Sequence, residues 1–202
     1  MRDLSLTATL LALLLTGACC PPLTTDYSSP ESTLLGWQSH LCHDDPDGEY
    51  RCLSDGFKQR TGNWQTYYSA RNELLDAEPL LAALLSRADL SSRIVEQHTS
   101  EDGLSATLDI DVGDDDTTVA FVLETTIFID LIDGPPLVSR TSTAVAASLR
   151  SGGGRQWLEF TGARPELRLT DEQRAAIVGV RMEQRWVIDD IEGLIPMGAL
   201  AP

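Results

Sequence analysis

An α+β fold is predicted by the order of two hydrophobic periodicities along the chain. Apolar residues recur at helical spacing to about residue 87, and from residue 92 onward they alternate with the two-residue period of strands. We therefore expect three N-terminal helices packed on a curved, mostly antiparallel sheet of about six strands, because neither layer can bury its apolar side alone. The 202-residue length and 42% hydrophobic content suit one domain with a short appendage and exclude a wholly disordered chain.

Residues 1–18 are predicted to be a signal peptide. The apolar stretch Leu4–Thr16 is too short to cross a bilayer core as a helix, which takes about 20 residues. The residues that end this stretch, Leu15-Thr16-Gly17-Ala18-Cys19, resemble a bacterial lipobox. The resemblance implies cleavage before Cys19 and a lipid on its sulfur, which would anchor the protein in the cell envelope, facing the periplasm or in the outer membrane. A plain signal peptide cut near Ala18, giving a secreted protein, is the alternative.

Three further segments follow the signal peptide. Residues 19–30 comprise the lipidated cysteine and a Pro/Ser/Thr-rich stretch typical of a flexible tether. Residues 31–192 are expected to form the single α+β domain, and residues 193–202 a C-terminal tail.

The three helices follow from capping signals and apolar spacing. Ser29 before Pro30 is typical of an N-cap with proline at the first helical position, which starts a helix over 30–42. Aromatic and leucine side chains at helical spacing predict a second helix over about 48–59 and a third from Asn63 to about Arg87.

The strands follow from alternation of apolar and polar residues. They are expected over 92–99, 105–112, 117–131, 137–149, 155–161 and 180–191. A Gly-rich turn should pair the fourth of these segments with the fifth. Within the less regular stretch 163–179, Thr170-Asp171-Glu172-Gln173 is typical of a helix start.

Export would place the four cysteines in an oxidising compartment. Cys42 and Cys52 flank a turn-forming stretch and are therefore the expected disulfide partners. The alternative is a pair of reduced thiols in the core.

The acidic turns suggest a metal site only weakly. Asp45, Asp47 and Gly48 match part of a calcium loop, but no Glu occupies its twelfth position. We expect a solvated turn in which Asp47 caps the next helix, and a hairpin turn at Asp114-Asp115-Asp116. No metal and no cofactor is predicted.

Charge excludes one class of partner. The formal net charge is −16, which argues against nucleic acid, since binding it requires clustered cations. Between Ile94 and Ser139 the chain has 11 acidic residues and no Lys or Arg.

Three stretches resemble the nuclear transport factor 2-like superfamily, which includes ketosteroid isomerases and scytalone dehydratase. They are Ser29–Leu35, Glu49–Phe57 and Arg185–Ile191. The resemblance implies a cone in which the sheet wraps around the helices and leaves a pocket. Some members use this pocket for acid–base chemistry on a hydrophobic substrate.

The candidate catalytic residues are Glu124 and His98. Glu124 lies between Val122 and Thr126 on a face expected to be covered, where burial would raise its pKa. A carboxylate paired with an Arg of the next strand, and a solvent-facing histidine, are the competing structural interpretations. Tyr50, Tyr67 and Asp130 are further ionisable residues that such a pocket could use.

We expect a non-catalytic binding or interaction domain, with an acid–base isomerase, dehydratase or hydrolase as the alternative. The expected partners are the membrane, through Cys19, and either another protein or a small hydrophobic ligand. A homodimer formed through an open sheet face is a further expectation.

Overall fold

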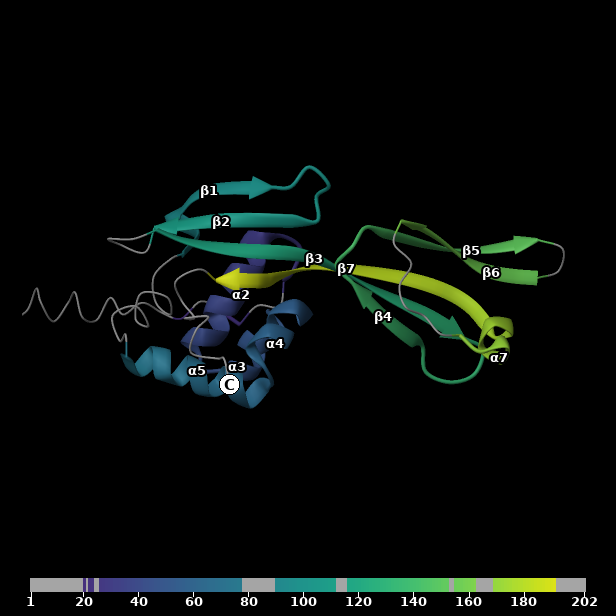
Figure 1. The fold of residues 1–202 in the computed structure, drawn as a ribbon, viewed down its shortest axis with the longest axis horizontal. Coiled ribbons are helices and arrows are strands. Elements are labelled where there is room, and N and C mark those ends of the chain that lie inside the picture. Colours follow the sequence, from purple (N-terminus) through teal and green to yellow (C-terminus); the bar gives the residue numbers. More distant parts are fainter. Residues whose placement is uncertain are drawn as a thin grey trace, which may run out of the picture.

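Helices come first and strands follow in the computed structural model of the chain (Figure 1). The structure describes residues 20, 22–23, 26–77, 90–111, 116–152, 155–162 and 169–191. Four helices open this described part: α2 (Pro30–Cys42), α3 (Pro46–Arg51), α4 (Asp55–Thr61) and α5 (Trp64–Ala77). A short 3-10 helix, η1 (Leu90–Arg93), leads into the strands. The α+β class is thus confirmed, with four helices described before the strands instead of three.

Local capping explains why the helix predicted over 30–42 is correct. The Ser29 hydroxyl accepts a hydrogen bond from the Ser32 backbone N–H at 3.0 Å, and the Ser32 hydroxyl accepts one from the Ser29 N–H at 3.0 Å. This capping box satisfies two N–H groups that would otherwise lack partners, and Pro30 has no N–H to satisfy.

The helix predicted over 48–59 is wrong, because the chain leaves helical geometry between α3 and α4. Cys52 ends α3 in a turn, and Leu53 forms an isolated parallel bridge with Ile188 of the last strand. Ile188 N–H donates to Cys52 O at 2.8 Å, and Ser54 N–H donates to Ile188 O at 2.8 Å. Ser54 then caps α4 by accepting from Phe57 N–H at 2.8 Å. The apolar spacing continues through the break, so periodicity alone does not reveal it.

The sheet has five antiparallel strands in the order β1-β2-β3-β4, with β7 added to β3. Their bounds are β1 (Ile94–Thr99), β2 (Ser105–Asp111), β3 (Asp116–Leu131), β4 (Leu137–Thr141) and β7 (Ile177–Ile191). The first half of β3 pairs with β2 and its second half with β4, while β7 runs along almost its whole length. The long β3–β7 ribbon is therefore the central element of the sheet.

The strand predicted over 137–149 is two strands. After β4 the chain bends, and β5 (Val145–Gly152) forms a separate two-stranded sheet with β6 (Arg155–Gly162). The Thr141 hydroxyl lies 2.7 Å from that of Thr143 and accepts from the Thr143 N–H at 3.2 Å, so side chains hold the bend. The predicted pairing of β5 with β6 is confirmed.

Among the described elements, the helices α2 to α5 lie against one end of the β3–β7 ribbon (Figure 1). There Leu34, Phe57, Leu108 and Phe121 belong to the main core. At the other end the β5–β6 hairpin covers a second core around Ile127, Ile129 and Ile177, next to the short helix α7 (Asp171–Ala175). The sheet does not close around the helices. A strand pair this long has an apolar side that one helical layer cannot cover, so a second layer is required.

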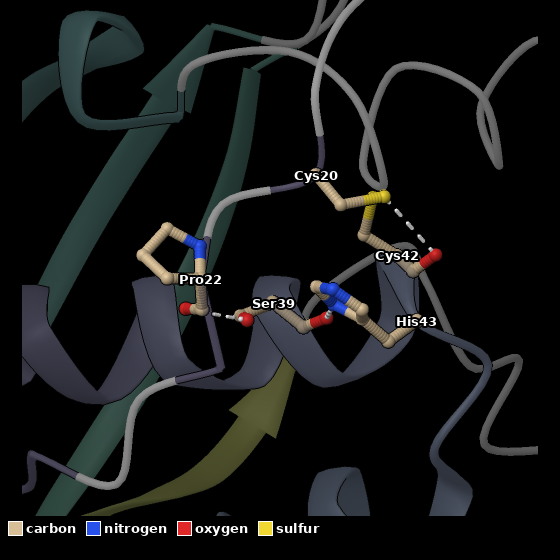
Figure 2. The surroundings of a disulfide bond; sticks show 5 residues. All are labelled: Cys20, Pro22, Ser39, Cys42 and His43. Carbon is tan, nitrogen blue, oxygen red and sulfur yellow. Dashed lines mark hydrogen bonds between the residues drawn. A yellow bond between two sulfur atoms is a disulfide. The ribbon is translucent and has the colours of Figure 1, made fainter.

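The predicted Cys42–Cys52 disulfide is wrong. Cys42, the last residue of α2, is bonded to Cys20, with the two Cα atoms 5.7 Å apart (Figure 2). Cys52 is a buried free thiol, and its Sγ lies 3.4 Å from the Gly48 carbonyl oxygen. The pairing of residues 52–54 with β7 holds Cys52 in the core, away from the end of α2.

The described residues of the predicted tether lie against the domain. Cys20 is fixed by the disulfide, and the Ser39 hydroxyl donates to Pro22 O at 2.9 Å (Figure 2). Farther along, Trp186 N–H donates to Tyr27 O at 2.9 Å. Attachment at these three points contrasts with the free tether that the composition suggested.

Several expectations fall on residues that the structure does not describe. They are the signal peptide 1–18, the lipid on Cys19, the part of the third predicted helix after Ala77, the turn at Asp114-Asp115 and the tail 193–202. None of the described helices combines the length and the apolar character needed to span a bilayer.

Reduction of the Cys20–Cys42 bond should lower the free energy of unfolding by about 3 kcal/mol, since it cross-links residues 22 positions apart. Urea unfolding with and without a reductant measures this. Cys42→Ser should be insensitive to the reductant, whereas Cys52→Ala should keep the full response. Loss of the response in Cys52→Ala would instead show that Cys52 forms the bond.

Candidate functional site

A polar pocket of about 450 Å³ lies between α4 and the sheet. One side of α4, the middle of β3, the end of β4 with the residue after it, and the end of β7 line it. Its charged side chains are Asp55, Arg60, Glu124, Arg140 and Asp189. Neutral polar side chains and Gly56 complete the lining, and its single apolar side chain is Val122.

Glu124 forms the buried base of this pocket, with 4% of its surface exposed. Its Oε1 accepts from the Asp55 backbone N–H at 2.9 Å, and its Oε2 accepts from Arg185 Nη2 at 2.9 Å. Arg185 lies directly opposite Glu124 on β7. A backbone N–H at the start of α4 and the Arg185 guanidinium therefore each occupy one oxygen of the Glu124 carboxylate.

Asp189 holds α4 against β7. Its Oδ1 accepts from the Ser54 hydroxyl at 2.5 Å, and its Oδ2 lies 3.4 Å from Arg60 Nη2, which also donates to the Asp189 carbonyl. A Cβ on Gly56 would lie 3.1 Å from Asp189 Oδ1, so the absent side chain allows this close approach. Both carboxylate oxygens of Asp189 are thus engaged inside the protein.

The charged side chains at the rim of the pocket form longer, partly exposed ion pairs. Asp55 Oδ2 lies 3.8 Å from Arg140 Nη1, and Asp55 Oδ1 lies 3.9 Å from Lys58 Nζ. The Asp55 and Arg140 side chains are each nearly half exposed. Solvent screens such pairs, which contribute about 1 kcal/mol or less each, so they can exchange partners readily.

The structure does not bring the predicted site residues together. Of the five candidates, Glu124 alone lines the pocket. His98 is exposed on β1, with Nε2 3.1 Å from Glu96 Oε1, and Asp130 pairs with Arg181 at 3.2 Å on the β3–β7 ribbon. The remaining two, Tyr50 and Tyr67, pack against each other with ring centroids 5.5 Å apart.

Sequence reasoning missed Ser54, Arg140 and Asp189. Ser54 before Asp55-Gly56 is a signal for a helix cap and could have indicated the start of α4. Arg140 and Asp189 enter the pocket only through strand register, which the spacing of their neighbours does not show.

A second group of ionisable side chains is buried between α3 and α5. Glu49 is fully buried and accepts from Arg71 Nη2 at 2.7 Å, from Arg71 Nε at 2.9 Å and from the Tyr67 hydroxyl at 2.9 Å. Burial raises the pKa of Glu49 despite the opposing effect of the Arg71 guanidinium. Burial also raises the pKa of Tyr67 well above its ordinary value. This group joins two helices and lies apart from the pocket lining.

The free thiol of Cys52 is a poor nucleophile. Burial raises the pKa of Cys52 to about 12, and burial also raises that of its neighbour Tyr27 to about 12. Since the thiolate is the nucleophile, Cys52 is a structural residue.

The acidic turn before α3 works as a helix cap. Asp45, in place of the expected Asp47, caps α3 by accepting from Gly48 N–H at 3.0 Å, and it lies 2.9 Å from His40 Nδ1. The hydrogen bond from Gly48 lowers the pKa of Asp45.

Among the described residues, the one group with metal-ligand spacing is Glu96, His98 and Asp109, on β1 and β2.

No protein-family model matches the chain, and neither the curated proteins nor the solved structures contain a significant match to it. Function is therefore inferred from the residues themselves.

Glu49 should make the protein less stable as pH rises. With its pKa raised in the native state, protonation of Glu49 contributes stability that is fully present below the ordinary value of 4.5 and is lost as pH rises through the native pKa. Glu49→Gln removes this titration. The excess of wild-type over variant unfolding free energy should therefore fall with rising pH, as measured by urea unfolding from about pH 3 to pH 7.

Asp130→Asn is the control of opposite sign. A hydrogen bond from Arg181 lowers the pKa of Asp130, so the stability that it contributes is present above its ordinary value of 3.8 and is lost on acidification. The excess of wild-type unfolding free energy over that of Asp130→Asn should therefore rise with pH. The raised pKa of Glu49 would be contradicted if the excess of wild-type over Glu49→Gln unfolding free energy stayed constant or rose with pH.

Proposed function

We propose that the protein is a lipid-anchored cell-envelope protein whose α+β domain, of the nuclear transport factor 2-like type, binds a small polar ligand without transforming it. The observation that carries this proposal is the pairing of the carboxylates in the pocket. Glu124 and Asp189 are each held by an arginine and by a second donor. A general base requires an accessible oxygen with a pKa near the working pH, and these groups are committed to structural bonds.

The rim supplies the groups for binding. Arg140 faces Asp55 at 3.8 Å, which is too long for a strong hydrogen bond, and its guanidinium is half exposed. A ligand carboxylate could pair with this guanidinium through two parallel hydrogen bonds. Since Val122 is the single apolar side chain of the lining, the pocket suits a small carboxylate better than the hydrophobic ligand expected from the sequence.

Two features support the nuclear transport factor 2-like type. The helices precede an antiparallel sheet, and the pocket lies between a helix and that sheet, as the resemblance implies. The open sheet and the added β5–β6 hairpin are departures, so the cone would be a partial one.

The disulfide supports export and constrains the anchor. Disulfides persist in oxidising compartments such as the cell envelope. Cys20 is the residue after the proposed lipidated Cys19, and its bond to Cys42 ties that point to the end of α2. The domain would then sit directly on the membrane surface.

Binding should appear as stabilisation of the native protein. Thermal unfolding with small mono- and dicarboxylates should show a rise in Tm, equivalent to about 2.7 kcal/mol at a concentration of about 100 Kd. Arg140→Gln should abolish the rise, and Arg150→Gln, on exposed β5, should not. Stabilisation by apolar ring compounds alone, or an undiminished response in Arg140→Gln, would refute the proposed ligand class.

The burial of Glu124 at the pocket base favours one alternative, an acid–base isomerase, dehydratase or hydrolase. Turnover of a bound compound that is lost in Glu124→Gln would establish that alternative. Binding without turnover supports the proposal.

Anchoring is tested separately, by phase partitioning in detergent. Wild-type protein should enter the detergent phase, and Cys19→Ser should move to the aqueous phase. Cys20→Ser is the matched control: it loses the disulfide but keeps the anchor, so it should stay in the detergent phase. Cys19→Ser protein in the detergent phase would show that Cys19 is not the anchor.

A further inference from the structure

The outer face of the β1–β2 hairpin brings together one histidine and two carboxylates. Glu96 and His98 are two residues apart on β1 and therefore point to the same side of the sheet. Asp109 lies directly opposite Glu96 on β2. The ligand atoms of the three side chains all lie within 4.8 Å of one another.

The third strand orients this cluster. Thr118, opposite Asp109 on β3, donates its hydroxyl hydrogen to Asp109 Oδ1 at 2.7 Å. One oxygen of the Asp109 carboxylate is thereby fixed in position. A hydrogen bond to a carboxylate in this way is the usual support of a metal ligand.

Charge around the cluster favours a cation. The β1–β2 hairpin itself, residues 94–111, has 5 acidic residues and no Lys or Arg. Arg93, which precedes β1, donates to the Asp111 carbonyl at 3.2 Å. Glu96 and His98 are both more than half exposed, so the face is open to ions from solution.

We propose that Glu96, His98 and Asp109 bind a divalent transition-metal ion, with Zn²⁺ as the best match. Imidazole nitrogen and carboxylate oxygen are ordinary zinc ligands, with bonds of about 2.1 Å, so tetrahedral ligand atoms lie about 3.4 Å apart. Nε2 of His98 is already 3.1 Å from Glu96 Oε1. Small rotations of exposed side chains would close the remaining distance. Three protein ligands leave a position for water or for an exogenous ligand.

The histidine distinguishes this site from one for calcium or magnesium. Those ions take oxygen ligands and, for calcium, six to eight of them. Imidazole suits zinc, copper and nickel, so the cluster should prefer these ions. It uses no residue of the pocket, and it does not depend on the proposed function.

The test measures Zn²⁺ binding to the full-length protein in detergent, by competition with a chromogenic chelator. One Zn²⁺ per chain should bind, and His98→Gln and Asp109→Asn should each weaken binding by about tenfold or more. Asparagine at position 109 keeps an oxygen for the Thr118 hydroxyl, so the strand pairing should be undisturbed.

Two controls lie outside the cluster. His43→Gln removes another exposed histidine, and Glu101→Gln removes an exposed carboxylate of the same hairpin. Both should bind Zn²⁺ as the wild type does, and Zn²⁺ should raise the Tm of the wild type but not that of His98→Gln. The proposal is overturned if the wild type binds no Zn²⁺, or if His98→Gln binds it as tightly as His43→Gln.

Discussion

Two backbone hydrogen bonds between Ile188 and the segment 52–54 join the helical layer to the sheet. They end α3, fix Ser54 as the cap of α4, and place the start of α4 over the middle of β3. Glu124 can accept from the Asp55 N–H only because of that placement. The pocket is thus a consequence of the short break between α3 and α4, where Leu53 pairs with Ile188.

The same stretch explains the cysteine pairing. Holding Cys52 beside β7 buries its sulfur in the core and leaves Cys42 at the surface end of α2. Cys42 then meets the N-terminal segment, which crosses α2 and continues to Tyr27 beside Trp186. The described residues of this segment, from Cys20 to Tyr27, are therefore part of the domain surface.

The sequence correctly predicted the elements whose position is set by residues close to one another in the chain. Ser29 and Thr170 each form a capping box, and the alternation in β2 marks a strand with one buried face. The predictions of secondary structure failed where residues distant in the chain determine the local conformation. Nothing near residue 53 indicates that Ile188 will pair there, and the β-branched pattern runs unbroken through the bend at Thr143. The site follows the same rule: the covered face of Glu124 was predictable, but Ser54 and Asp189 are 135 residues apart in the chain.

The separation of β3 and β7 along the chain has a consequence for biogenesis. Their contacts join residues as far apart as Val119 and Ile191, so one long edge of β3 stays unpaired until β7 has been synthesised. Non-local pairing of this kind slows folding and leaves a strand edge open to aggregation in the meantime. A nascent chain would therefore need shielding of this edge until β7 emerges.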